Sequence, residues 1–92
     1  MPIKTSSLTV TTSPIQIKPN RMRTNISITN LGETRISIIS NGNLAESEGY
    51  PIESGNSFLM GKVYGDNPTN SFYLISSSGS NSCRVLETLL YY

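Results

Sequence analysis

The 92-residue sequence contains no histidine and no tryptophan, and it contains one cysteine, Cys83. Histidine is the commonest general base near neutral pH and a frequent metal ligand, so its absence argues against most catalytic and metal chemistry. A single cysteine excludes an internal disulfide framework, and such a residue usually acts as a small buried hydrophobe. We therefore predict that the chain is not an enzyme and has no catalytic residues, no metal site and no cofactor.

Charge is also scarce, at 14% of residues, with seven Lys and Arg against six Asp and Glu. A net charge of +1 gives no electrostatic reason to expect nucleic acid or a membrane surface as partner. The densest basic cluster is Lys18, Arg21 and Arg23. We expect it on a solvated strand edge, where charges deter unwanted pairing. Arg23 and Arg35 are also candidates for salt bridges to a neighbouring chain.

No run approaches the roughly 18 apolar residues that a membrane-spanning helix needs, and the N-terminal residues lack the apolar core of a signal peptide. We expect a soluble protein that is synthesised in the cytoplasm.

Apolar and polar residues alternate along much of the sequence, with a period of two residues. Residues 23–30 place Ile26 and Ile28 between polar residues, and residues 34–40 repeat the pattern with Ile36 and Ile38. Such alternation is typical of strands with one buried face. Gly32 lies between the two segments and suits a tight turn, so the pattern predicts an antiparallel hairpin.

Further strands are predicted over residues 7–12, 15–18, 57–63, 71–76 and 82–92, and no window favours a helix. Seven or eight short strands separated by turn residues indicate one all-β domain over residues 1–92. The expected architecture is an antiparallel β-sandwich, jelly-roll or immunoglobulin-like, with a small barrel as the alternative.

The segment 49–60, GYPIESGNSFLM, has the composition of either a pocket or a corner. Its glycines and proline favour a corner: a break between strands at Gly49–Pro51, then a turn over 53–56 with Gly55 at positive φ. A strand then starts at residue 57, with Phe58 and Met60 on one face. Any task beyond turning would be contact with a neighbouring subunit through Tyr50.

Three carboxylates, Glu46, Glu48 and Glu53, cluster in and before this segment. A glycosidase would need two carboxylates that face one sugar at a fixed separation. Predicted loops with little apolar sequence nearby favour solvated carboxylates instead. Weak cation binding is the next alternative, and catalysis is the least favoured.

The C-terminal residues 88–92 form a candidate docking tail. Leu89, Leu90, Tyr91 and Tyr92 make an apolar chain end, which frays unless it is docked. Soluble monomers rarely expose such a patch. We therefore expect these four residues at an interface.

Several short motifs occur together between residues 15 and 87, namely Asn20-Arg21, Asn30-Leu31-Gly32, Gly49-Tyr50-Pro51-Ile52, Gly55-Asn56-Ser57, Tyr73-Leu74-Ile75-Ser76 and Arg84-Val85-Leu86-Glu87. Together they resemble a pattern of small bacteriophage virion structural proteins. The resemblance implies a capsid decoration protein in the virion, a homo-oligomer that contacts the major capsid protein or neighbouring structural subunits. Alternatives are a head-fibre base, a neck or tail component, or a carbohydrate- or receptor-binding fibre module that uses exposed tyrosines such as Tyr50 and Tyr64.

Overall fold

The computed structural model describes residues 3–39, 49–61 and 71–90, which form eight strands and no helix. The strands are β1 (Ile3–Val10), β2 (Ile15–Ile17), β3 (Arg23–Asn30), β4 (Ile36–Ile39), β5 (Tyr50–Ile52), β6 (Ser57–Gly61), β7 (Phe72–Ser76) and β8 (Asn81–Leu89). All except β5 overlap a segment that the sequence predicted as a strand. The predicted all-β class is therefore confirmed for the described residues.

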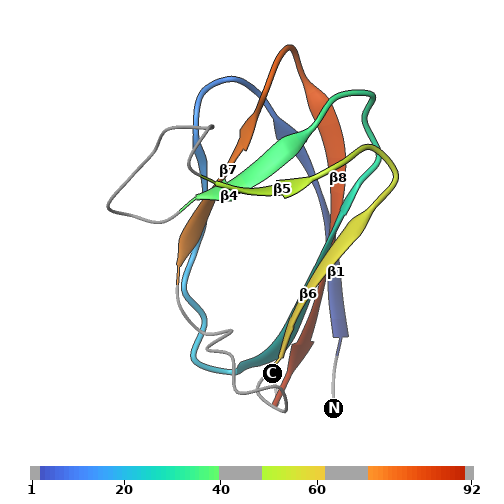
Figure 1. Cartoon of the computed structure of the whole chain (residues 1–92). Coiled ribbons are helices and arrows are strands. Elements are labelled where there is room, and N and C mark those ends of the chain that lie inside the picture. Colours follow the sequence, from blue (N-terminus) through green and yellow to red (C-terminus); the bar gives the residue numbers. More distant parts are fainter. Residues whose placement is uncertain (1–2, 40–48, 62–70, 91–92) are drawn as a thin grey trace.

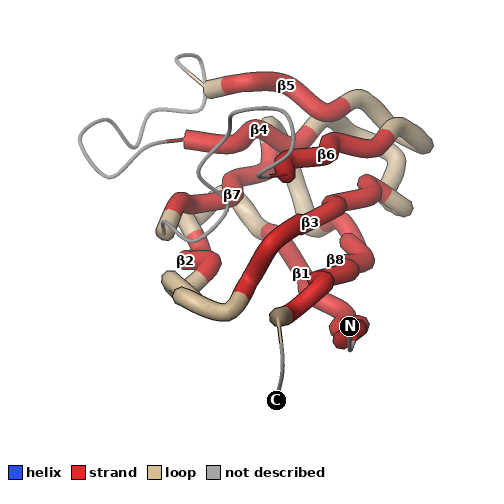
Figure 2. The backbone as a smooth tube through the Cα atoms, turned by 90° about the horizontal axis from the view of Figure 1, so that it is seen from below, coloured by secondary structure: helices blue, strands red, loops and turns tan. Residues whose placement is uncertain are grey.

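The strands make two four-stranded antiparallel sheets that face each other (Figures 1 and 2). The first sheet has the order β1-β8-β3-β6 and the second has the order β2-β7-β4-β5. This interleaved order is that of an eight-stranded jelly roll, in which a chain folded as Greek keys alternates between two sheets. Of the two sandwiches that the sequence allowed, the jelly roll is the observed one.

The predicted hairpin of residues 23–30 and 34–40 is wrong. β3 belongs to the first sheet and pairs with β6 and β8, whereas β4 belongs to the second sheet and pairs with β5 and β7. The connection over residues 31–35 therefore crosses from one sheet to the other. The Leu31 N–H still donates to the Ser82 carbonyl of β8 at 2.9 Å, whereas the Gly32 and Thr34 N–H groups donate to side-chain oxygens.

Two buried asparagines hold this crossing connection. The Asn30 amide donates to the main-chain oxygens of Thr34 (2.8 Å) and Ile52 (3.0 Å), and its oxygen accepts from the Gly32 N–H (2.9 Å). The Asn81 oxygen accepts from the Thr34 N–H at 3.0 Å. The Asn81 amide group donates to the hydroxyls of Thr34 and Ser76, both at 2.7 Å. Because buried amides are costly when unpaired, this network specifies one geometry for the end of the sandwich where these strands meet.

Alternate residues of each strand meet between the sheets and form the core. Its fully buried members include Val10, Ile26, Ile28, Ile36 and Leu74. Cys83 lies among them, as predicted for a small buried residue, and burial raises the pKa of its thiol from 9.0 to about 11.

The segment 49–60 is a corner of the sandwich, as the sequence predicts. Gly55 has φ of 81°, and the Asn56 N–H donates to the Glu53 carbonyl at 3.0 Å, which closes the turn. Phe58 and Met60 share the face that packs on the core. One detail differs: Tyr50–Ile52 is not a break but the short strand β5. Pro51 is tolerated there because β5 is an edge strand.

Candidate functional site

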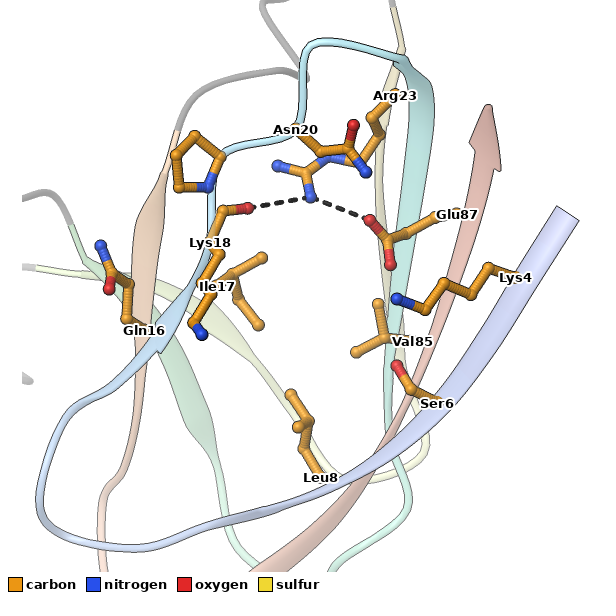
Figure 3. A pocket seen from close by; sticks show the side chains of 11 residues that line it. Lys4, Ser6, Leu8, Gln16, Ile17, Lys18, Asn20, Arg23, Val85 and Glu87 are labelled. Carbon is orange, nitrogen blue, oxygen red and sulfur yellow. Dashed lines mark hydrogen bonds and ion pairs between the residues drawn. The ribbon is translucent and has the colours of Figure 1, made fainter. Parts of the chain in front are cut away.

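A cavity of about 250 Å³ lies between the edge strands β1 and β2, at the opening between the two sheets (Figure 3). Its apolar wall consists of Leu8, Ile17 and Val85. Its polar lining includes Ser6, Asn20 and four charged residues, Lys4, Lys18, Arg23 and Glu87. The cavity therefore combines an apolar side with a concentration of charge that is unusual for this charge-poor chain.

The charges reach the cavity because polar residues occupy inward positions of the strands. On β1, every second residue from Lys4 onward lies on the same face of the strand: Lys4, Ser6, Leu8 and Val10. Glu87 falls in the same alternation as the buried Val85 on β8, directly across the ladder from Lys4. Because successive side chains on a strand point to opposite faces, all of these residues face the space between the sheets.

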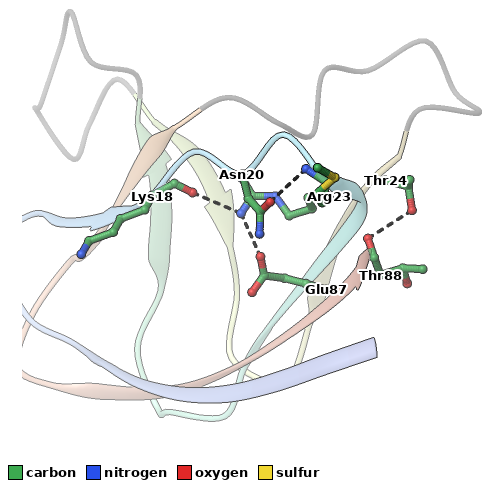
Figure 4. A network of polar contacts seen from close by, with 7 residues as sticks. Lys18, Asn20, Arg23, Thr24, Glu87 and Thr88 are labelled. Atoms are coloured by element: carbon green, nitrogen blue, oxygen red, sulfur yellow. Dashed lines mark hydrogen bonds and ion pairs between the residues drawn. The ribbon is translucent and has the colours of Figure 1, made fainter. Parts of the chain in front are cut away.

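Arg23 is the most deeply buried charge of the cavity, with 2% of its surface exposed. Its Nη1 donates to Glu87 Oε2 at 2.9 Å and to the Lys18 carbonyl at 3.2 Å (Figure 4). The Glu87 side chain is 11% exposed. The expectation that Arg23 sits on a solvated strand edge is therefore wrong, whereas Lys18 and Arg21 are exposed as expected.

A β-bulge turns Arg23 inward. The pairing of β3 with β8 shifts register between Arg23 and Asn25, so Arg23 and Thr24 are both buried although they are neighbours in the sequence. The Thr24 hydroxyl donates to the Thr88 carbonyl at 3.1 Å. Glu87, which follows the inward Cys83 and Val85 in the same alternation, was the signal in the sequence that pointed to a buried partner for Arg23.

The cavity carries a surplus of positive charge. Three cationic side chains line it against one carboxylate, and Glu87 is paired with Arg23. Lys4 and Lys18 form no salt bridge with any carboxylate in the described part of the chain. In Figure 3 the Lys4 side chain points into the cavity beside Val85 and Glu87. The arrangement can attract and hold an anionic group.

A second candidate surface is the outer face of the β1-β8-β3-β6 sheet, which we call the outer sheet face. Its residues are those opposite in phase to the core: Ile3, Thr5, Ser7 and Thr9 on β1; Ser82, Arg84, Leu86 and Thr88 on β8; Asn25, Ser27 and Thr29 on β3; and Ser57, Leu59 and Gly61 on β6. Arg84 is the single charge among them. Most of the others are serine and threonine.

Two leucines project from the middle of this face. Leu86 and Leu59 both pair with Ser27, so they lie in one row across the sheet. Leu86 is 38% exposed and Leu59 is 53% exposed. Exposed large aliphatic side chains on a face with almost no charge are typical of a protein–protein contact surface.

The residues predicted to form an interface do not gather at one place. Tyr50 is 62% exposed, and its ring lies 5.4 Å from that of Phe58 at a tilted angle. Arg35 and Leu90 are exposed, but Leu89 is buried within this chain and pairs with Arg23.

The Leu90 N–H donates to the Met22 carbonyl at 2.7 Å, so the predicted tail is docked on its own sheet up to residue 90. Tyr91 and Tyr92 lie outside the described residues, as do Tyr64, Glu46 and Glu48. Glu53 is exposed, as expected for a solvated carboxylate.

Within residues 3–39, 49–61 and 71–90, no three Cys, Asp or Glu side chains lie close enough together to hold a metal ion. The same residues contain no helix with the length and apolarity to cross a membrane.

Together, the fold and the cavity define a small double-stranded β-helix, the jelly-roll class to which a de novo designed protein of known structure also belongs. That design superimposes with a TM-score of 0.53 at 13% identity, covering 92% of this chain and 99% of the design. The EutQ protein of Clostridium difficile superimposes with a TM-score of 0.62 at 10% identity and covers 98% of this chain. This chain spans 59% of the length of EutQ.

The SPBc2 prophage-derived protein YomS has the same fold, with a TM-score of 0.52 and 8% identity over 95% of each chain. The sequence matches no protein-family model and no curated protein. At these identities the likeness shows the fold, and a jelly roll supports many unrelated functions.

Proposed function

We propose that this chain is a non-enzymatic structural protein of a bacteriophage particle, which decorates the capsid through protein–protein contacts. The observation that carries the proposal is the outer sheet face, which exposes Leu59 and Leu86 on a surface with one charge. Support also comes from the sequence resemblance to small virion proteins and from the shared fold of a prophage-derived protein.

The edge strands of the two sheets are protected against pairing with strands of other chains, which favours contact through a sheet face. β2 is three residues long and lies between Pro14 and Pro19. β5 contains Pro51. β1 carries the inward charge of Lys4. Short strands, prolines and inward charges are devices that prevent edge-to-edge pairing. β6, the other edge strand of the first sheet, has no proline and no inward charge, but it is short, with five residues.

The size of the outer sheet face suits an assembly with many contacts. Four strands at a spacing of about 4.8 Å, with five to nine residues at about 3.3 Å each, give a face of roughly 300–600 Å². A contact of that size lies below the range of stable pairwise interfaces. A subunit in a symmetric particle compensates through several weak contacts that act together. The proposed partner is therefore a neighbouring protein subunit of the particle with an uncharged surface of its own.

Quantitative mass spectrometry of purified phage particles tests the proposal. We expect the chain in the particles at hundreds of copies, as a decoration protein requires. A dozen or fewer copies would assign it to the neck, the tail or a fibre. Its absence from particles, while the lysate contains it, would refute the structural role.

A further inference from the structure

We propose that the cavity between β1 and β2 binds a small ligand that carries a carboxylate on an apolar stem. This site is separate from the outer sheet face, because Lys4, Ser6 and Glu87 occupy the inward phase of their strands. It would give the chain a small-molecule binding activity that a contact surface does not require.

The apolar stem is inferred from the wall. Leu8, Ile17 and Val85 line the cavity, and all three belong to the hydrophobic core or pack against it. Ligand pockets in proteins combine an apolar wall with a few convergent polar groups. The volume of about 250 Å³ is slightly below the roughly 300–1,000 Å³ of pockets for drug-sized molecules, so the ligand is small.

The carboxylate is inferred from the charges. Lys4 and Lys18 lie at the cavity without a salt bridge to any described carboxylate, and each has three N–H donors. Arg23 is buried and already bonded to Glu87 and to the Lys18 carbonyl, so it acts as a fixed positive charge that also orients the Lys18 backbone. A carboxylate bound at the cavity would leave one net positive charge there instead of two.

The pairing of Arg23 with Glu87 also argues against a cationic ligand. Among the described residues, Glu87 is the only carboxylate of the cavity lining. A bound cation would compete with Arg23 for it and would lie among three like charges.

Titration of the uniformly ¹⁵N-labelled chain with hexanoate, followed by amide NMR shifts, tests the proposal. Hexanol and inorganic phosphate serve as parallel titrants. Hexanol supplies only the apolar stem, and phosphate supplies only the negative charge. We expect saturable shifts at residues 4–8, 16–20 and 85–87 with hexanoate, and weaker responses to the other two. Binding should weaken as NaCl is raised, because salt screens the lysines.

The double variant K4M/K18M keeps the length of both side chains and removes both charges. It should bind hexanoate at least about fivefold more weakly, since exposed ion pairs contribute up to about 1 kcal/mol each. R84Q is the matched control, because Arg84 is exposed on the opposite face of β8 and should leave affinity unchanged.

Four results would overturn the proposal. These are shifts scattered over the whole surface, no saturable shift, an equal response to hexanol or to phosphate, and full affinity in K4M/K18M. Neither lysine is buried, so the variants are expected to fold, and their unfolding midpoints verify it.

Discussion

At the scale of single residues, the most consequential feature is a buried ion pair in a chain with few charges. Arg23 and Glu87 are 64 positions apart and meet at 2.9 Å with little solvent access. Removing two charges from water costs several kcal/mol each, which their attraction and added hydrogen bonds only offset. Such a pair adds little net stability, but removing one partner leaves the other as an uncompensated buried charge.

The variant R23M should therefore lower the free energy of unfolding by about 3 kcal/mol, the lower end for broken buried pairs because Glu87 borders the cavity. The double variant R23M/E87L should recover most of the loss, since it removes both charges. Urea unfolding followed by circular dichroism measures both. R84M, at an exposed arginine of β8, is the control and should change stability by less than about 0.5 kcal/mol. A loss in R23M no greater than in R84M would contradict the role assigned to the pair.

The thiol of Cys83 gives a second prediction at this scale. Its pKa of about 11 leaves roughly a thousandth of the thiol ionised at pH 8, and the side chain is buried, so the folded chain should resist alkylation. Iodoacetamide labelling followed by mass spectrometry should show modification only on unfolding. Rapid labelling of the folded chain would contradict the burial.

The same shift predicts a pH dependence of stability. Between pH 9 and 11 the unfolded chain releases the thiol proton while the folded chain keeps it. The unfolded state then binds fewer protons, so the free energy of unfolding falls as pH rises through this window. The variant C83A provides the reference, because tyrosines and lysines also titrate there. Identical pH profiles for both proteins would contradict the prediction.

At the scale of elements, the sequence predicted the strands well and their partners poorly. The period-two pattern located residues 23–30 correctly because one face of β3 is buried. The same local pattern carries no information about which sheet a strand joins, so the hairpin prediction failed. The bulge that buries Arg23 is likewise set by pairing with β8, far away in the sequence. The sequence did place charged residues, Lys4 and Glu87, at strand positions where the alternation otherwise gives buried apolar residues.

The connection from β3 to β4 can be tested through Gly32. A Cβ at this position would overlap the buried side chain of Asn81. G32A should displace that amide and disturb its bonds to Thr34 and Ser76, at a cost of about 2–3 kcal/mol in unfolding free energy. In an N81A background the same substitution should cost much less, because the obstacle is gone. Additive effects of the two substitutions would contradict the proposed contact.

At the scale of the whole molecule, the chain is a sandwich with two different candidate binding surfaces. The outer sheet face is nearly uncharged, and it exposes Leu59 and Leu86. The cavity lies at the side of the sandwich, between edge strands, and concentrates charge. The sequence alone suggested a contact protein, with contacts at Tyr50, Arg23, Arg35 and the tail, but Arg23 and Leu89 are buried within this chain. The outer sheet face was hidden because its leucines belong to different strands.

We propose that the outer sheet face attaches this chain to a phage particle. The most direct test is to produce particles in cells that express the chain only as L59K/L86K and to count its copies per particle by quantitative mass spectrometry. Two lysines on a desolvated face should reduce the copies at least about tenfold. L31K is the matched control, since Leu31 is similarly exposed but lies on the connection after β3, and it should give wild-type numbers. Wild-type copy numbers for L59K/L86K would contradict the account.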